Sequence, residues 1–324
     1  GIFHGHQNFV TIAKSLWHPF DELRHPPDLL TKAIHNVLSR SKIDIARERL
    51  ATLRKWRDWA DELQEPELSL KNNMEPHVRK VMSCKRVLLL NKLATEVLDW
   101  PDKFLFDDLC NGFRLVGEAP AIGVFKTQPK VGNISEAELM KQSKFLRPAI
   151  IGKTNSASMS EHESELYDIT VREAEEKGWL QGPREFSEVC NLFGSQWLPV
   201  RRFCVEQRGK LRPIDDCHEA QLNQAYSVTS YLKLQDVDYI AGLALCIAER
   251  LAAGDNGPAR EPWLGKCLDL SKAYKQMAVH PDHRHMAVIF FYDLAGRPRY
   301  YVANSLMFGS CAAVYSFNRV SRSL

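Results

Sequence analysis

The sequence predicts an α+β protein, in which a mostly helical N-terminal region precedes a region of paired strands. Two observations predict this class. From Asp28 onward apolar residues recur at helical spacing, at Leu30, Ala33, Ile34, Val37 and Leu38, whereas residues 201–215 read as two strands about a short turn. The chain is 44% hydrophobic and 26% charged, which is an ordinary globular composition with enough apolar material for a sizeable core. Its length of 324 residues suggests two or three domains or subdomains.

The first half of the chain is expected to hold a series of helices and turns. Asp28 can cap the first helix. A second amphipathic stretch, residues 46–63, carries arginines and lysines beside Trp56 and Trp59. It either lies along nucleic acid or buries the tryptophans and leaves a solvated basic face, and we favour the second interpretation. The other expected segments are a connector at 66–76, a helix at 78–97, turns and short strands at 104–131, a short helix at 136–145, a flexible linker at 154–160 and a charged helix at 161–177.

The second half is expected to contain the strands. Residues 201–207 and 210–215 form a hairpin about the turn Arg208-Gly209. Because Pro213 has no N–H, it confines the returning strand to a sheet edge or a bulge. The other expected segments are a turn at 182–183, a helix at 238–252, a loop at 254–258, a buried strand at 263–268, strands at 285–292 and 300–303, and a helix at 308–324.

Composition and charge set broad limits on function. The net charge of +3 permits a nucleic-acid partner without arguing for one. The eight cysteines form no Cys-x-x-Cys, which predicts reduced thiols in an intracellular protein, with nucleus and cytoplasm left open. The sequence has no apolar run of eighteen residues and no signal peptide, so no membrane partner is expected. Gly1 and Leu324 suggest a piece of a longer chain.

Asp269 is the leading candidate for a metal ligand. It follows the predicted strand 263–268, and Tyr274 comes five residues later. A carboxylate at the end of a buried strand is well placed to hold Mg²⁺, which prefers oxygen ligands and shares them with phosphates. The alternative is that Asp269 is only a cap or turn former.

Cations gather on the predicted hairpin. Arg208, Lys210 and Arg212 lie on or near its tip, where a rigid ribbon could hold a polyphosphate. A solvated hairpin tip explains the same residues equally well.

Three histidines offer a weaker metal hypothesis. His280, His283 and His285 surround Asp282 at spacings that suggest zinc ligands. The alternative is a surface turn between palm strands, which is what the family resemblance described below implies.

Three blocks in a fixed order resemble the reverse transcriptases of retroelements. The hairpin is similar to the fingers signature of that family, a Lys, an Arg two residues later, an acidic end and a downstream Asn, here Lys210, Arg212, Asp216 and Asn223. Residues 267–277 resemble the first palm motif, in which a metal-binding Asp is followed five residues later by an aromatic residue. Residues 280–296 resemble the palm hairpin that comes next.

The third block runs from Ser305 to Arg319. It resembles the Pro-Phe-Gly-Leu motif with a Phe-Gln-Arg downstream, because Phe317 follows Gly309 by eight residues. Met307 stands where the family usually has Pro, and Val314 where a second Pro is common, which puts the shape of the substrate pocket in doubt. The resemblance covers about residues 178–324.

The resemblance implies fold and domains. It implies a right-hand polymerase with fingers and an incomplete palm at 178–324, behind a helical region of unknown role at 1–153 and a linker with a charged helix at 154–177. The aromatic-x-Asp-Asp hairpin of the family would lie beyond Leu324, as would the thumb. The chain alone is therefore expected not to polymerise.

The resemblance also implies a reaction and its residues. A primer 3′-hydroxyl attacks the α-phosphate of a deoxynucleoside triphosphate on an RNA or DNA template, between two Mg²⁺ or Mn²⁺ ions roughly 3.5–4 Å apart. Asp269 would bind the metals and the Leu270 carbonyl could add a ligand. Lys210 and Arg212 would hold the triphosphate. Tyr274 would exclude a 2′-hydroxyl, and Phe308 and Gly309 would pack near the incoming nucleotide.

Two other functions compete with this one. The chain could be a repurposed copy that binds RNA or DNA without chemistry, in which case salt-sensitive binding would occur without metal-dependent extension. It could also be a metal-dependent hydrolase built on Asp269 and the histidines.

Overall fold

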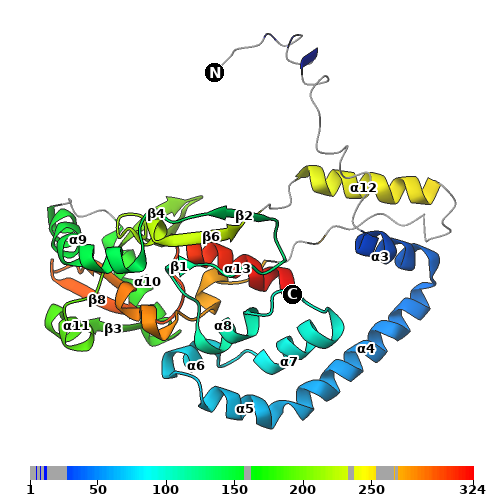
Figure 1. The fold of residues 1–324 in the computed structure, drawn as a ribbon, viewed down its shortest axis with the longest axis horizontal. Helices are drawn as coiled ribbons and strands as arrows, with labels where there is room; N and C mark the ends of the chain where they lie inside the picture. The colour runs from blue at the N-terminus through cyan, green and yellow to red at the C-terminus, as the bar shows by residue number, and fades with distance from the viewer. Residues whose placement is uncertain are drawn as a thin grey trace. The chain divides into compact units, whose positions relative to one another are not determined.

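The computed structural model describes residues 5, 8, 11–12, 28–156, 162–232, 237–252, 266 and 269–324. The chain divides into two compact units, residues 1–58 with 233–268, and residues 59–232 with 269–324. Helices and a mixed sheet occur together, which confirms the α+β class (Figure 1). The boundaries expected at 153 and 177 both fall inside the second unit. None of the helices in the described part of the chain combines the length and hydrophobicity that a bilayer span requires.

The first unit contains three described helices. They are α3 (Asp28–Ser39), most of α4 (Lys42–Glu62) and α12 (Val237–Ala252), and all three were predicted. The basic residues of α4 are exposed, as expected for a solvated face. Trp56 and Trp59 are half-buried rather than enclosed in a core.

The second unit begins with short helices where the sequence predicted a connector and one long helix. They are α5 (Gln64–Asn72), α6 (Pro76–Met82), α7 (Val87–Lys92) and the π-helical turn η1 (Leu93–Val97). A further helix, α8 (Leu105–Asn111), lies where turns and short strands were predicted. Pro66 lies in the first turn of α5, where its missing N–H breaks no helical hydrogen bond, so the connector prediction was wrong.

The buried carboxylate of Glu67 explains why a single helix at 78–97 was also wrong. Its two oxygens accept hydrogen bonds from the backbone N–H groups of Val87 at 2.9 Å and Leu88 at 2.8 Å. These donors have no partner within α7, because they belong to its first turn. Glu67 therefore fixes a new helix start at Val87.

A five-stranded sheet forms the centre of the second unit. Its order is β3 (Leu180–Arg184), β8 (Pro298–Ala303), β7 (Val288–Tyr292), β4 (Pro199–Gln207) and β5 (Lys210–Asp215). Only β4 and β7 pair in parallel among these strands. The β4–β5 hairpin is confirmed, and β5 is an edge strand, as Pro213 required.

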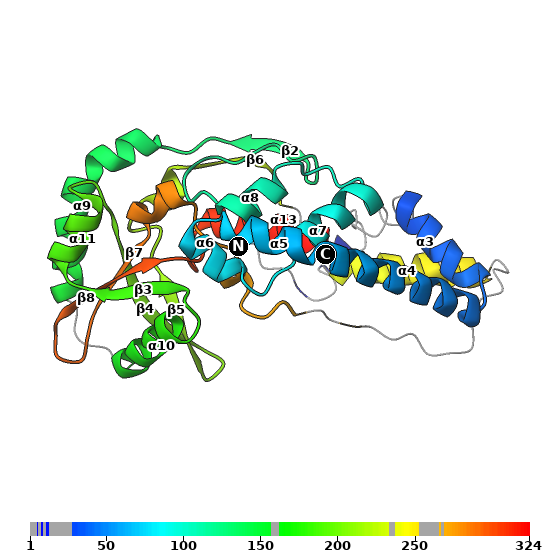
Figure 2. The same cartoon turned by 90° about the horizontal axis from the view of Figure 1, so that it is seen from below.

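Both faces of this sheet are buried. Along β7, Ile289 and Phe291 enter the main core, whereas Val288 and Phe290 enter a second cluster. Helix α10 (Glu163–Glu175) contacts β3, β4 and β5, while α9 (Glu136–Ser156) contacts β4 and β7 and α11 (Phe186–Phe193) contacts β8. The strands lie between α10 on one side and α9 and α11 on the other (Figure 2).

A second, smaller sheet lies beside helix α13 (Cys311–Ser323). Its order is β1 (Gly117–Glu118), β6 (Tyr226–Ser230) and β2 (Thr127–Lys130). Tyr315 of α13 packs edge-on against Tyr226. The short 3₁₀ helices η2 (Leu222–Gln224), η3 (Ala273–Gln276) and η4 (Pro281–Met286) complete the unit.

Several predicted boundaries were wrong. Helix α9 continues past the predicted end at residue 145 to Ser156, so it includes residues 154–156 of the expected linker. The rest of that linker, 157–160, lies outside the described residues. Gly182 and Pro183 lie inside β3 rather than in a turn. Strand β7 begins at Val288, because His285 belongs to η4, and α13 begins at Cys311. The predicted strand 263–268 and loop 254–258 lie outside the described residues, apart from Lys266.

Candidate active site

Asp269 opens the loop that leads into η3. The residue has no regular secondary structure and its side chain is exposed, while Leu270 is half-buried. The Leu270 carbonyl accepts a hydrogen bond from the Ala273 N–H at 3.2 Å. Gln276 closes the loop, since its side-chain amide donates to the Ser271 carbonyl at 2.6 Å. The loop thus presents one carboxylate to solvent on a hydrogen-bonded turn.

Tyr274 belongs to a cluster of three aromatic rings. Its ring centroid lies 4.9 Å from that of Phe308 and 5.5 Å from that of Phe317, which it meets edge-on at 89°. Both distances are in the range of favourable aromatic pairs. The burial that this packing causes raises the pKa of the Tyr274 hydroxyl. Two blocks that are more than thirty residues apart in sequence therefore meet at Tyr274.

The Phe308-Gly309 turn is held by the base of the hairpin. The Asp215 N–H donates to the Phe308 carbonyl at 2.9 Å. Gly309 has a φ of +109°, and a β-carbon at this position would collide with the carbonyl oxygen of Asp215. Only glycine accommodates both the backbone angle and the close approach.

Asn223 fastens the same turn to η2. Its side-chain amide donates to the Gly309 carbonyl at 2.9 Å, and its oxygen accepts from the Cys311 N–H at 2.8 Å. Cys311 is the first residue of α13, so Asn223 satisfies one of the unpaired donors of that helix. This contact joins the predicted fingers signature to the predicted Phe-Gly motif.

Lys210 and Arg212 lie on the outer part of the hairpin. Both are exposed, and they pair across the ladder with Gln207 and Val205. Residues two apart on a strand share one face, so the two cations project to the same side. Within the described part of the chain, no side-chain hydrogen bond or ion pair links Lys210, Arg212 or Asp269 to the aromatic cluster. The structure brings together Tyr274, Phe308 and Gly309, but not the other predicted site residues.

A buried group of four charges lies behind the turn, and the sequence did not predict it. Arg202 donates to Asp215 at 2.7 and 3.3 Å and to Glu173 at 2.9 Å. The ammonium of Lys275 lies 3.6 Å from Glu173 and 3.8 Å from Asp215 and has no hydrogen bond. Burial alone would lower the pKa of Arg202, but the two carboxylates outweigh it and raise the pKa. The backbone N–H of Asp215 also binds the Phe308 carbonyl, so this charged group supports the Phe308-Gly309 turn.

The cross-strand register could have revealed half of this group. A turn at Arg208-Gly209 places Arg202 opposite Asp215, as the structure shows. An opposite-charge pair at facing positions of a hairpin is a recognisable signal. The partners Glu173 and Lys275 come from α10 and η3 and carry no such signal.

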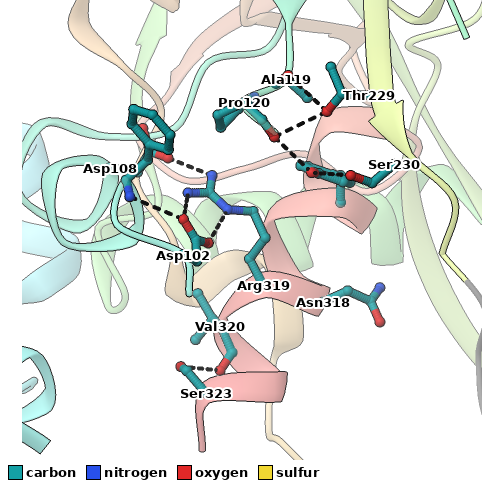
Figure 3. A network of polar contacts seen from close by, with 12 residues as sticks. Asp102, Asp108, Ala119, Pro120, Thr229, Ser230, Asn318, Arg319, Val320 and Ser323 are labelled. Atoms are coloured by element: carbon teal, nitrogen blue, oxygen red, sulfur yellow. Dashed lines mark hydrogen bonds and ion pairs between the residues drawn. The ribbon is translucent and has the colours of Figure 1, made fainter. Parts of the chain in front are cut away.

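A second buried ion pair anchors α13. Arg319 donates to both oxygens of Asp102, at 2.7 and 3.1 Å, and to Asp108 at 2.5 Å. Figure 3 shows the guanidinium extending from α13 toward these carboxylates. Burial raises the pKa of Asp108, although Arg319 opposes the rise. The pair ties the third predicted motif to the helices near residue 105.

The three histidines do not form a metal site. His283 is 1% exposed and its Nδ1 accepts the Leu115 N–H at 2.9 Å, so the expected surface turn was wrong for this residue. His280 accepts the Asp282 N–H through Nδ1 at 3.3 Å. Burial lowers the pKa of His283 to about 4.

A dication would find an incomplete donor set. Among the described residues, no group of three His, Cys, Asp or Glu side chains converges as metal ligands do. Asp269 and the Leu270 carbonyl supply three oxygens at most, so water and substrate phosphates would have to complete the octahedral shell of a Mg²⁺ ion there. Comparison of the chain with protein-family models and with curated proteins gives no match.

Proposed function

We propose that this chain is the fingers and first part of the palm of an RNA-directed DNA polymerase. The observation that carries the proposal is the meeting of three sequence blocks at the Phe308-Gly309 turn. Tyr274 comes from the first palm motif, and Asn223 from the fingers signature. The motifs were matched on sequence order alone, so their convergence on one turn is an independent reason for the proposal.

The proposed roles follow from exposure and position. Lys210 and Arg212 are exposed cations on one face of a rigid ribbon, which suits a triphosphate. Tyr274 and Phe308 form an aromatic wall on which the sugar and base of a deoxynucleotide would rest. The described residues cannot hold two dications, so we assign no step to Mg²⁺ or Mn²⁺. Asp269 is the carboxylate that a catalytic ion would need first.

Primer extension tests the proposal. The protein is the polypeptide that carries this chain together with its second carboxylate motif, and the substrates are an RNA template, a DNA primer and deoxynucleoside triphosphates. We expect Asp269→Asn to reduce incorporation at least a hundredfold. Asp99→Asn is the matched control, because its carboxylate is 96% exposed and, among the described residues, pairs with Lys103 alone. Full activity of Asp269→Asn would refute the proposal.

Sugar selection gives a second readout of the same site. Tyr274→Ala should admit ribonucleotides, because it removes the side chain that we place beneath the sugar. Phe317→Ala is the matched control, since it removes a different ring of the cluster and keeps the Tyr274 side chain. Unchanged selectivity in Tyr274→Ala would count against the assigned role.

A binding module without chemistry is the second candidate function. It is favoured by the exposed, unaccompanied carboxylate of Asp269 among the described residues. Binding of a template-primer that weakens steeply with salt, with no incorporation even when the second motif is present, would support it.

A further inference from the structure

A pocket of about 290 Å³ lies between the helices α6–α8, the loop after Asp269, and α13. Its walls are mostly apolar and include Leu90, Leu109, Leu270, Met277 and Val320. The volume is close to the lower end of the range for small-molecule sites, roughly 300–1,000 Å³. An apolar pocket of this size suits a small aromatic ligand or a short alkyl chain.

Two cationic residues line the pocket, the exposed Arg86 and the half-buried Lys85, and Lys85 is the one removed from solvent. The half-buried ammonium of Lys85 donates to the Val81 carbonyl at 2.8 Å, which closes the end of α6. An ammonium has three donors, so this bond leaves two for another acceptor. Lys85 forms no ion pair with any residue of the described ranges.

The neighbouring charges leave Lys85 uncompensated. Burial lowers the pKa of its ammonium; the neighbouring Cys84 opposes this shift, and the nearby cation of Lys71 adds to it. Lys71 itself lies 3.2 Å from Glu67, whose two oxygens are already committed to the start of α7. A desolvated cation with a like charge beside it is stabilised by an incoming anion.

We propose that this pocket binds a small amphiphilic anion. The apolar part would contact Leu90, Leu270 and Met277, and its anionic group would accept the two free donors of Lys85. The proposal does not rest on the proposed polymerase function, although Leu270 and Phe317 belong to both the pocket and the candidate active site. Leu270 and Gln276 also belong to the loop that follows Asp269, so a bound ligand touches that loop.

Two fluorescent probes test the proposal directly. The first is 8-anilinonaphthalene-1-sulfonate, and the second is N-phenyl-1-naphthylamine, which has the same rings without the charge. Each is titrated into the full chain and into two variants. Lys85→Met removes the cation and keeps an apolar stem, whereas Lys130→Met removes an exposed lysine of β2 as a control.

We expect the wild-type chain to bind one sulfonate probe in this pocket. Lys85→Met should weaken it about tenfold, equivalent to about 1.4 kcal/mol, and leave the neutral probe within twofold. Lys130→Met should change neither probe. Equal affinities of the sulfonate probe for wild type and Lys85→Met, or no binding, would overturn the proposal.

A pocket-filling variant separates this site from general surface binding. Val320→Trp occupies the pocket and should abolish binding of both probes. Leu90→Phe, a smaller change in the same wall, replaces it if circular dichroism shows that Val320→Trp is unfolded. Probe fluorescence that a folded pocket-filling variant leaves unchanged would place the binding elsewhere and refute the site.

Discussion

Removing one partner of the Arg319–Asp102 pair should destabilise the second unit strongly. The side chains of Arg319 and Asp102 are 2% and 0% exposed, and two hydrogen bonds join them. Asp102→Asn keeps the shape of the side chain but leaves the partly exposed Asp108 as the one counter-charge of Arg319 within the described ranges. Breaking a buried pair in this way costs about 3–5 kcal/mol. That is a large share of the roughly 5–15 kcal/mol that holds a domain folded.

Urea unfolding followed by tryptophan fluorescence measures the effect. Trp197 is fully buried in the second unit and reports on its unfolding. With a denaturant slope of about 1–3 kcal/mol per molar, a loss of 3 kcal/mol shifts the midpoint by about 1–3 M. Asp99→Asn is the control, because its pair with Lys103 is exposed and should contribute less than about 1 kcal/mol.

A double variant distinguishes loss of the pair from loss of packing. Asp102→Leu with Arg319→Met removes both charges and leaves apolar groups. It should be less destabilised than the sum of the single variants, because neither charge is left buried alone. A cost below about 1 kcal/mol for Asp102→Asn, or strict additivity in the double variant, would refute the reasoning.

Three other changes test the turn, the buried charges and the histidine. Gly309→Ala should lower the free energy of unfolding by more than about 2 kcal/mol, because its β-carbon would collide with Asp215 and its backbone would be strained. Gly209→Ala is the control: its φ is +70° but its surroundings are open, so it should cost only about 1–2 kcal/mol. Urea unfolding midpoints compare the two variants. Arg202→Met should cost about 3–5 kcal/mol and Lys275→Met clearly less, because Lys275 makes no hydrogen bond; similar losses would contradict this ranking. His283 has a folded pKa of about 4, below its unfolded value of about 6.5, so the unfolded chain binds the extra proton and stability falls as the pH drops from 6.5 to 4, by at most about 1.4 kcal/mol per unit. His283→Gln should flatten this pH dependence, and an unchanged slope would show that other groups cause it.

Local patterns predicted the hairpin and its place in the sheet. Arg208-Gly209 between two apolar runs sets a two-residue turn, which fixes the register of the whole ladder. Pro213 then identifies the edge strand, since it cannot donate to a further neighbour. Both signals lie within fifteen residues of one another, and for that reason the sequence was sufficient.

In the helical region, reasoning from local patterns was wrong because contacts between distant segments decide where the helices begin. Pro66 and the charged residues around it look like a connector, and residues 78–97 look like one helix. What decides the outcome is Glu67, whose carboxylate is buried against the start of α7 twenty residues later. A helix start that depends on a side chain from another helix leaves no pattern in its own sequence.

In the candidate site, too, the sequence indicates which residue is buried but not which residue it contacts. Along α13 the buried residues Ala312, Tyr315, Ser316, Arg319 and Ser323 recur at helical spacing. The sequence therefore indicates that Arg319 faces the interior, and a buried arginine needs a carboxylate. It does not indicate that the carboxylate is Asp102, which lies 217 positions earlier. Because that pair holds α13, and α13 carries Phe317 against Tyr274, the helices near residue 105 belong to the physical support of the proposed nucleotide site.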